Sequence, residues 1–178
     1  MKLIKLIAVL LLVSFPLASQ GNMFNFLKKN NYIISPEISG HLTQDGQVLA
    51  GMDVYLEGGF LKNRYHDNAK TDLNGRFYFE PIVHSQWLKK NPLNQAYSYI
   101  GIYIIVEREK VYLWESLFSY DEPYDIIINN LTNLNCNVNS TEYKYYFKNP
   151  VVPDGVDMML LSRCEVKGYK SREKNQED

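Results

Sequence analysis

The chain has 178 residues, a formal net charge of −1 at pH 7 and 46% hydrophobic residues. A chain of this length is typical of one ordinary domain with a single sizeable core. Binding to nucleic acid needs a surplus of basic residues on one surface, so the charge balance argues against a nucleic-acid partner.

The first 21 residues have the layout of a secretory signal peptide. Lys2 and Lys5 give a basic start, an unbroken apolar run follows at residues 6–13, and small residues at positions 18, 19 and 21 offer cleavage sites. The run is shorter than the 18 or more apolar residues of a membrane-spanning helix, and no later segment is long and apolar enough. We therefore expect export, with cleavage between residues 18 and 22 and no membrane span.

A polar lead-in at residues 22–35 precedes the domain, which we place at residues 36–166. The lead-in carries an apolar hook at residues 23–27. We expect this hook to cover a sheet edge, and a partner-binding arm is the alternative.

The first part of the domain alternates between apolar and polar residues, the period-2 pattern of half-buried strands. The pattern covers residues 38–43 and 52–57, and Asp45-Gly46 between them is a turn signal. Residues 60–70 are polar and are expected to form an exposed connection. Asp72-Leu73-Asn74-Gly75 then predicts a tight hairpin turn, because Asn-Gly tolerates the positive φ that such turns require.

The middle of the domain contains the most apolar segment. A strand is expected at residues 76–80, and residues 85–90 are expected to form a short helix with Trp87 and Leu88 inward. Residues 99–106 alternate between two apolar faces, which predicts a central strand.

The remaining segments are also strand-like. Residues 111–115 are expected to return as the hairpin partner of the central strand. Further strands are predicted at residues 124–128, 134–138, 143–147 and 158–166. Residues 167–178 form a charged tail that we expect to be disordered. With eight or nine short strands and at most one short helix, the pattern predicts an all-β sandwich or barrel.

Residues 38–79 contain a motif with a family resemblance. The motif consists of Gly40-His41-Leu42, then Gly46-Gln47-Val48-Leu49-Ala50-Gly51-Met52-Asp53-Val54-Tyr55-Leu56, then Thr71-Asp72-Leu73-Asn74-Gly75-Arg76-Phe77-Tyr78-Phe79. It resembles the pattern of carboxypeptidase-regulatory-like, or transthyretin-like (prealbumin-like), domains, with Met52 in place of the usual Ala. The resemblance implies a single Ig-like or prealbumin-like β-sandwich of about seven to nine strands and says little about activity.

The whole layout is also similar to small exported bacterial proteins of unknown function that are built on this domain. They share a signal peptide, one sandwich and two late cysteines. The likeness implies a periplasmic or secreted location, and an accessory or binding role.

Cys136 and Cys164 are the only cysteines, and they lie 28 residues apart. An even count in an exported chain predicts a disulfide, which contributes about 3–4 kcal/mol in the loop-entropy account. Two buried thiols or a metal pair are the alternatives, although no His stands at zinc-ligand spacing.

The sequence offers weak candidates for catalysis. One hydrolase family on the transthyretin-like fold ends in Tyr-Arg-Gly-Ser, whereas this chain has Tyr169-Lys170-Ser171-Arg172. His41, His66 and His84 fit neither His-x-x-Glu nor His-Glu-x-x-His. We therefore assign no catalytic, cofactor-binding or metal-binding residue, and we expect no cofactor.

The aromatic content is high, with 14 Tyr and 8 Phe. Aromatic residues on a sheet face stack on sugars or anchor a protein partner. The candidate binding surface consists of Tyr112, Trp114, Tyr143, Tyr145 and Tyr146. The alternative is that these residues simply suit half-buried strand positions.

Two functional hypotheses follow. The first is an exported, non-enzymatic β-sandwich that binds an unknown protein or glycan partner. The second is a small periplasmic hydrolase that uses His41, His66 or His84 as its base. Two of these histidines with a carboxylate in one pocket would favour the hydrolase.

Overall fold

The computed structural model describes residues 29–60, 62–87, 97–119, 125–149, 154 and 157–175. The chain divides into two compact units, a larger one of residues 32–84 and 91–178 and a smaller one of residues 1–31 and 85–90. The predicted signal peptide and apolar hook lie outside the described residues.

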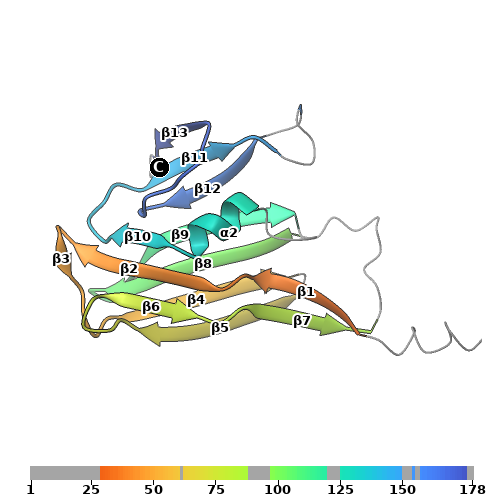
Figure 1. The fold of residues 1–178 in the computed structure, drawn as a ribbon, viewed down its shortest axis with the longest axis horizontal. Coiled ribbons are helices and arrows are strands. Elements are labelled where there is room, and N and C mark those ends of the chain that lie inside the picture. The colour runs from red at the N-terminus through yellow and green to blue at the C-terminus, as the bar shows by residue number, and fades with distance from the viewer. Residues whose placement is uncertain are drawn as a thin grey trace, which may run out of the picture. The chain divides into compact units, whose positions relative to one another are not determined.

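Strands form nearly all the regular structure of the described residues (Figure 1). The elements are β1 (Asn30–Ser35), β2 (Ile38–Gln44), β3 (Gln47–Val48), β4 (Asp53–Phe60), β5 (Asn63–Lys70), β6 (Arg76–Phe79), β7 (Ile82–Gln86), β8 (Tyr97–Val106), β9 (Glu109–Ser119), α2 (Asp125–Leu131), β10 (Leu134–Asn137), β11 (Tyr143–Phe147), β12 (Met158–Ser162) and β13 (Ser171–Lys174). The prediction of an all-β sandwich is confirmed, with more strands than the predicted seven to nine. In this part of the chain no helix is long and apolar enough to cross a membrane.

The strands form three sheets. The large sheet has the order β13-β11-β12-β9-β8-β4-β5, and β1 pairs with β7 in a two-stranded sheet. In the small sheet β2 lies between β10 and β6, and it also pairs with β3 (Figure 1). The pairing of β10 with β2 is parallel, whereas β6 is antiparallel to β2.

The main core lies between the large and the small sheet. Ile100, Ile102 and Ile104 of β8 are fully buried, as their alternation predicted. Ile38 and Leu42 of β2 are buried in the same hydrophobic cluster. Because β2 and β8 each have an apolar inward face, the large and the small sheet bury these faces against each other.

The predicted tight turn at residues 72–75 is present, but the prediction of a hairpin is wrong, because β5 before the turn belongs to the large sheet and β6 after it belongs to the small sheet. The Asp72 carboxylate accepts hydrogen bonds from the backbone N–H groups of Asn74 and Arg76, both at 2.8 Å. Gly75 has a φ of 72°, the left-handed conformation that favours glycine. The turn leads into β6 and so positions one side of the small sheet.

The prediction of an exposed connection at residues 60–70 is wrong, since β5 occupies most of this segment. This strand pairs with β4 over its whole length, from Asp53 opposite Lys70 to Phe60 opposite Asn63. Its polar sequence suits its place at the end of the large sheet, because charged residues protect edge strands from association.

The expected strand at residues 124–128 is also wrong, because α2 begins at Asp125. Ile127 and Leu131 are buried four residues apart, which places both on one face of the helix. Asp125 stands in the first turn, where a negative charge stabilises a helix. A short apolar run of this kind does not distinguish a helix from a strand by itself.

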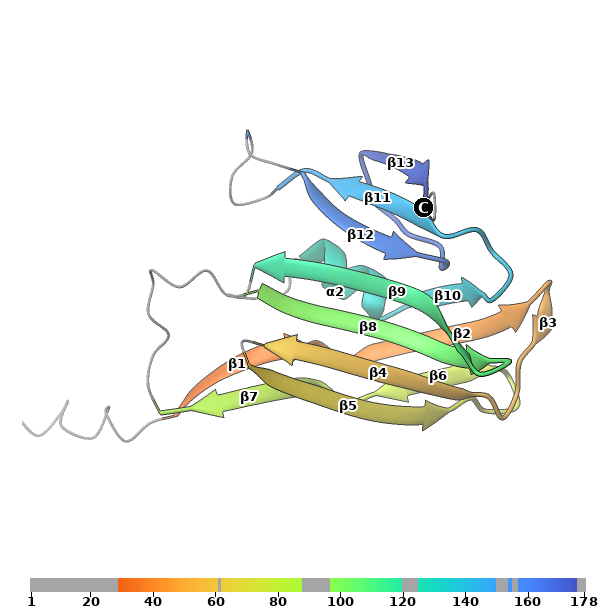
Figure 2. The same ribbon diagram turned by 180° about the vertical axis from the view of Figure 1, so that it is seen from behind.

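Two further expectations need correction. The expected helix at residues 85–90 is wrong at its start, because Ser85 and Gln86 end β7 and Trp87 is exposed; residues 88–90 lie outside the described residues. The tail at 167–178 was expected to be disordered, but Ser171–Lys174 forms β13, which pairs with β11 at the end of the large sheet (Figure 2).

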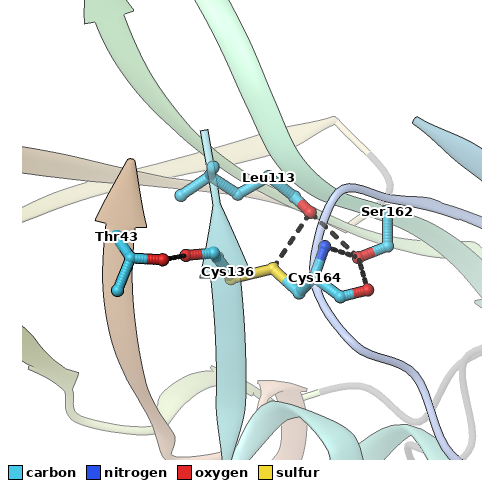
Figure 3. The surroundings of a disulfide bond; sticks show 5 residues. All are labelled: Thr43, Leu113, Cys136, Ser162 and Cys164. Carbon is cyan, nitrogen blue, oxygen red and sulfur yellow. Dashed lines mark hydrogen bonds between the residues drawn. A yellow bond between two sulfur atoms is a disulfide. The ribbon is translucent and has the colours of Figure 1, made fainter. Parts of the chain in front are cut away.

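The predicted disulfide between Cys136 and Cys164 is confirmed, and it joins the two layers of the sandwich (Figure 3). Cys136 belongs to β10 of the small sheet, and Cys164 lies two residues after the end of β12 of the large sheet. Both residues are buried. The cross-link therefore ties the chain that leaves β12 to the edge of the small sheet, where the two cysteines also form a backbone bridge.

Hydrogen bonds hold the backbone around the cross-link. The Ser162 hydroxyl donates to the Leu113 carbonyl oxygen at 3.0 Å and accepts from the Cys164 N–H at 2.9 Å. On the other side, the Thr43 hydroxyl donates to the Cys136 carbonyl oxygen at 3.2 Å (Figure 3). Both cysteines are thus fixed by neighbouring strands as well as by the sulfur bond.

We predict that Gly40→Ala destabilises the chain by about 1–3 kcal/mol through overpacking. A Cβ atom at this position would lie 2.4 Å from Phe77 Cζ and 3.0 Å from Leu134 Cβ. Gly58→Ala is the matched control, because its nearest contacts are ordinary ones at 3.5 Å. Urea unfolding should separate the two variants, and an equal loss in both would contradict the packing argument.

We also predict that Cys136→Ala with Cys164→Ala lowers the free energy of unfolding by about 3–4 kcal/mol, because the cross-link closes a loop in the unfolded chain. Urea unfolding of the double variant, compared with the oxidised wild-type chain, measures the loss. The wild-type chain unfolded in urea with reductant is the control and should match the double variant. A loss below about 1 kcal/mol would contradict the prediction, because it would mean that the cross-link restricts the unfolded chain very little.

Candidate functional site

The small sheet carries a polar groove of about 990 Å³ on the face that points away from the core. Its lining residues come from β2, β3, β6 and β10, from the turn before β6, from the end of α2 and the loop after it, and from the chain after Cys164. They are Ser39, Gly40, His41, Val48, Asn74, Arg76, Phe77, Tyr78, Asn129, Asn130, Asn133, Leu134, Asn135, Glu165 and Lys167. The groove thus brings together polar side chains from several separate elements.

Strand register arranges the floor of the groove in rows. His41 of β2 lies between Asn135 of β10 and Arg76 of β6. Ser39 lies opposite Tyr78 in the next row on the same face. Since neighbouring residues on β2 point into the core, these side chains face solvent.

Asn130 fixes one wall of the groove. It is only 6% exposed, and its amide donates hydrogen bonds to the carbonyl oxygens of Ile126 at 2.7 Å and Lys167 at 3.1 Å. Its side-chain oxygen accepts the Lys167 N–H at 2.8 Å. In addition, the Glu165 N–H donates to the Asn135 carbonyl oxygen at 2.9 Å. The segment that follows the disulfide is therefore held against both α2 and β10.

The groove combines neutral amides with a few charges. Arg76 and Lys167 are exposed cations, Glu165 is an exposed acid, and His41 is half-buried. The side chains of asparagine both donate and accept hydrogen bonds. The arrangement is therefore suited to holding a ligand rich in hydroxyl or amide groups.

Tyr112, one of the residues predicted for a binding surface, lies on the outward face of the large sheet among other tyrosines. Tyr55 and Tyr103 stack at 5.2 Å between ring centroids, and Tyr103 and Tyr112 are 5.4 Å apart. Lys110 Nζ lies 4.0 Å above the Tyr103 ring. The rings thus contact each other and a cation, which leaves less of their faces for a ligand.

On this face of the large sheet the hydroxyl groups of Tyr99 and Tyr112 are bonded to Glu57 and Glu115. Glu57 accepts hydrogen bonds from Tyr112 at 2.8 Å, Tyr99 at 3.1 Å and Lys110 at 3.1 Å. The Tyr99 hydroxyl also lies 2.9 Å from a Glu115 oxygen. Two carboxylates therefore share one hydroxyl.

The two carboxylates have opposite electrostatic environments. Burial raises the pKa of Glu115, and the hydrogen bond from Tyr99 only partly offsets this effect. Burial also acts to raise the pKa of Glu57, but the hydrogen bonds from Tyr112, Lys110 and Tyr99 hold it below its ordinary value. Burial and the neighbouring carboxylates raise the pKa of Tyr99, which therefore stays protonated.

The other predicted surface residues divide between core and edge. Trp114 is 0% exposed and Tyr145 is 3% exposed, so their assignment to a binding surface is wrong. Trp114 contributes to the main core and donates its ring N–H to the Ser116 hydroxyl at 3.0 Å. Tyr143 and Tyr146 are half-buried on β11, and the Tyr146 hydroxyl donates to Glu173.

The three histidines lie on different strands. His41 lines the groove together with Glu165. His66 is exposed on β5, opposite Glu57. His84 on β7 forms a hydrogen bond of 2.5 Å with the Tyr65 hydroxyl. Within the described residues, no group of three or more His, Cys, Asp or Glu side chains is arranged to hold a metal ion.

We predict that Glu115→Gln and Glu57→Gln change stability in opposite directions at pH 7. A carboxyl group whose pKa is raised in the folded protein lowers the stability of the fold as the pH rises from the ordinary pKa of 4.5 through the raised pKa. A neutral side chain at position 115 should therefore stabilise the fold at pH 7. An acid with a lowered pKa contributes stability above 4.5, so Glu57→Gln should destabilise it. Thermal unfolding between pH 4 and pH 8 measures both effects, and shifts of the same sign at pH 7 would contradict this assignment.

Comparison with known proteins gives one match. The family described as Domain of unknown function (DUF6795) matches residues 38–141, more than half of the chain. No curated protein and no solved structure matches the chain. The β-sandwich is confirmed, but these comparisons do not identify the carboxypeptidase-regulatory-like family in particular. The matched residues run from β2 to the end of β10 and include the floor of the groove. The chain therefore belongs to the DUF6795 family.

Proposed function

We propose that this chain is an exported, non-enzymatic binding module and that the groove on its small sheet holds a glycan. The observation that carries the proposal is the groove itself. It has an ordered floor of strand residues, a wall fixed by Asn130, and a lining dominated by side chains that form hydrogen bonds.

The side chains that line the groove favour a sugar as its ligand. Sugar hydroxyls donate and accept hydrogen bonds, as the asparagine amides of the groove do. Tyr78 is 45% exposed at one side and offers a ring on which a sugar face can stack. The volume of the groove lies within the range of ordinary ligand sites.

The disulfide and the predicted signal peptide support export. Disulfides persist in oxidising compartments such as the bacterial periplasm and the extracellular space. The similarity to small exported bacterial proteins favours the periplasm between these two.

The scattered histidines favour binding over hydrolysis. A His base in a hydrolase needs a second group that orients it or activates a nucleophile. The groove contains His41 and Glu165 but neither His66 nor His84. The condition set for the hydrolase, two of these histidines with a carboxylate in one pocket, is not met by the groove.

The test is a glycan array probed with the oxidised chain, followed by titration of the best ligand. We predict that Arg76→Ala combined with Asn133→Ala weakens binding about tenfold or more, because a lost hydrogen bond from the charged Arg76 contributes roughly 1.5–3 kcal/mol and one from the neutral Asn133 roughly 0.5–1.5 kcal/mol. Asn68→Ala, an exposed asparagine on β5, is the matched control and should keep the affinity.

Three results would contradict the proposal. The first is an array on which the folded chain binds no glycan. The second is an equal loss of affinity in the groove variant and in Asn68→Ala. The third is hydrolysis of model glycosides or esters that His41→Ala abolishes, which would favour the hydrolase.

A further inference from the structure

One row of the groove floor ends in charges of opposite sign. Arg76, His41 and Asn135 lie side by side on β6, β2 and β10. Cys136 and Cys164 form an antiparallel bridge, and the Glu165 N–H bonds to the Asn135 carbonyl oxygen at 2.9 Å, so Glu165 continues this row beyond Asn135. Since neighbouring strands are about 4.8 Å apart, about 14 Å separates the backbone of Arg76 from that of Glu165. The cationic end of the row is therefore well separated from its acidic end.

The side chains in the middle and at the cationic end of this row are free to bind a ligand. In the part of the chain that the structure describes, no ion pair or hydrogen bond involves the side chain of Arg76, His41 or Asn135. Three lysines elsewhere, by contrast, are each paired with a carboxylate. A guanidinium, an imidazole and an amide thus present unused hydrogen-bonding groups along one line of the groove.

The turn before β6 holds two of these residues in place. The Arg76 backbone N–H donates to the Asp72 carboxylate at 2.8 Å. A Cβ atom on Gly75 would lie 3.3 Å from His41 Cδ2, so the His41 ring lies close against this glycine. Residues that are already ordered lose less conformational freedom when a ligand binds.

Acidic side chains mark the parts of the groove that a negative group would avoid. Glu165 stands at the far end of the row, and the Tyr78 hydroxyl donates to Glu37 at 3.3 Å. The Asp72 carboxylate accepts backbone hydrogen bonds within its own turn. A negative group on the ligand is therefore favoured beside Arg76 and disfavoured beside Tyr78 or Glu165.

We propose that the groove is selective for an acidic glycan, whose carboxylate binds to Arg76 and His41 while its uncharged hydroxyl groups bind to Asn135. The planar guanidinium matches a carboxylate with two parallel hydrogen bonds. The imidazole offers at least one N–H donor in either protonation state. Two strand spacings, about 10 Å, lie between Arg76 and Asn135, so the ligand includes the acidic sugar and its neighbour in the glycan.

This inference rests on the proposed function, because it names the class of glycan that the groove takes. The test uses the oxidised chain and an array of galacturonate, glucuronate, mannuronate and sialate glycans. Each acidic glycan stands beside its methyl ester, which keeps the shape and removes the charge, and the array also carries neutral and sulfated glycans. Calorimetry at low and at high salt then follows the acidic glycan that binds best and its ester.

We predict that the ester binds the wild-type chain about tenfold or more weakly than the acid does, because it loses charge-assisted hydrogen bonds. High salt should weaken binding of the acid and leave binding of the ester nearly unchanged. Arg76→Gln should weaken binding of the acid about tenfold or more and binding of the ester about threefold or less. Arg108→Gln, at an exposed arginine between β8 and β9, is the matched control and should bind as the wild-type chain does.

The outcomes separate this inference from the glycan proposal. A folded chain that binds no glycan would overturn both. Binding to neutral glycans, or equal binding of acid and ester, would overturn the acidic class and leave the glycan proposal standing. Binding to sulfated glycans alone would overturn the assignment of a carboxylate. The comparison of acid with ester uses the wild-type chain, so it decides the question even if Arg76→Gln does not fold.

Discussion

The bond between Cys136 and Cys164 connects the parts of this molecule on which its candidate sites depend. On one side it holds β10, which completes the floor of the groove. On the other side it holds the chain that runs through Glu165 and Lys167 to Gly168. The groove wall and the base of the C-terminal strand therefore share one anchor. A cross-link between layers also stabilises this small sandwich, in addition to the stability that its hydrophobic core contributes.

Much of the fold was accessible from local patterns. Alternation identified the buried face of β8 at Ile100, Ile102 and Ile104, and an even cysteine count identified the disulfide. Asp72-Leu73-Asn74-Gly75 identified its turn because the side chain of Asp72 bonds within four residues. Each of these features depends on neighbours in sequence or on a simple count, so the sequence carries it directly.

The wrong predictions concern features that depend on tertiary packing. The apolar run that begins at Asp125 suits a strand or a helix, and burial of Ile127 and Leu131 on one face selects the helix. Composition marked Trp114 and Tyr145 as surface candidates, although the sheets enclose both. The groove was not predicted because its floor consists of strands that are distant in the sequence. No local motif indicates that Asn135 lies beside His41.

The parallel pairing of β10 with β2 has a consequence for the order in which the protein folds. Its contacts join residues that lie 93 positions apart in the sequence, as between Thr43 and Cys136. Closing so large a loop costs more chain entropy than closing the neighbouring hairpins, whose strands are adjacent in sequence. The β4–β5 and β8–β9 hairpins therefore have a kinetic advantage over the floor of the groove. A chain that starts unfolded would thus form these hairpins of its large sheet before the floor of the groove is complete.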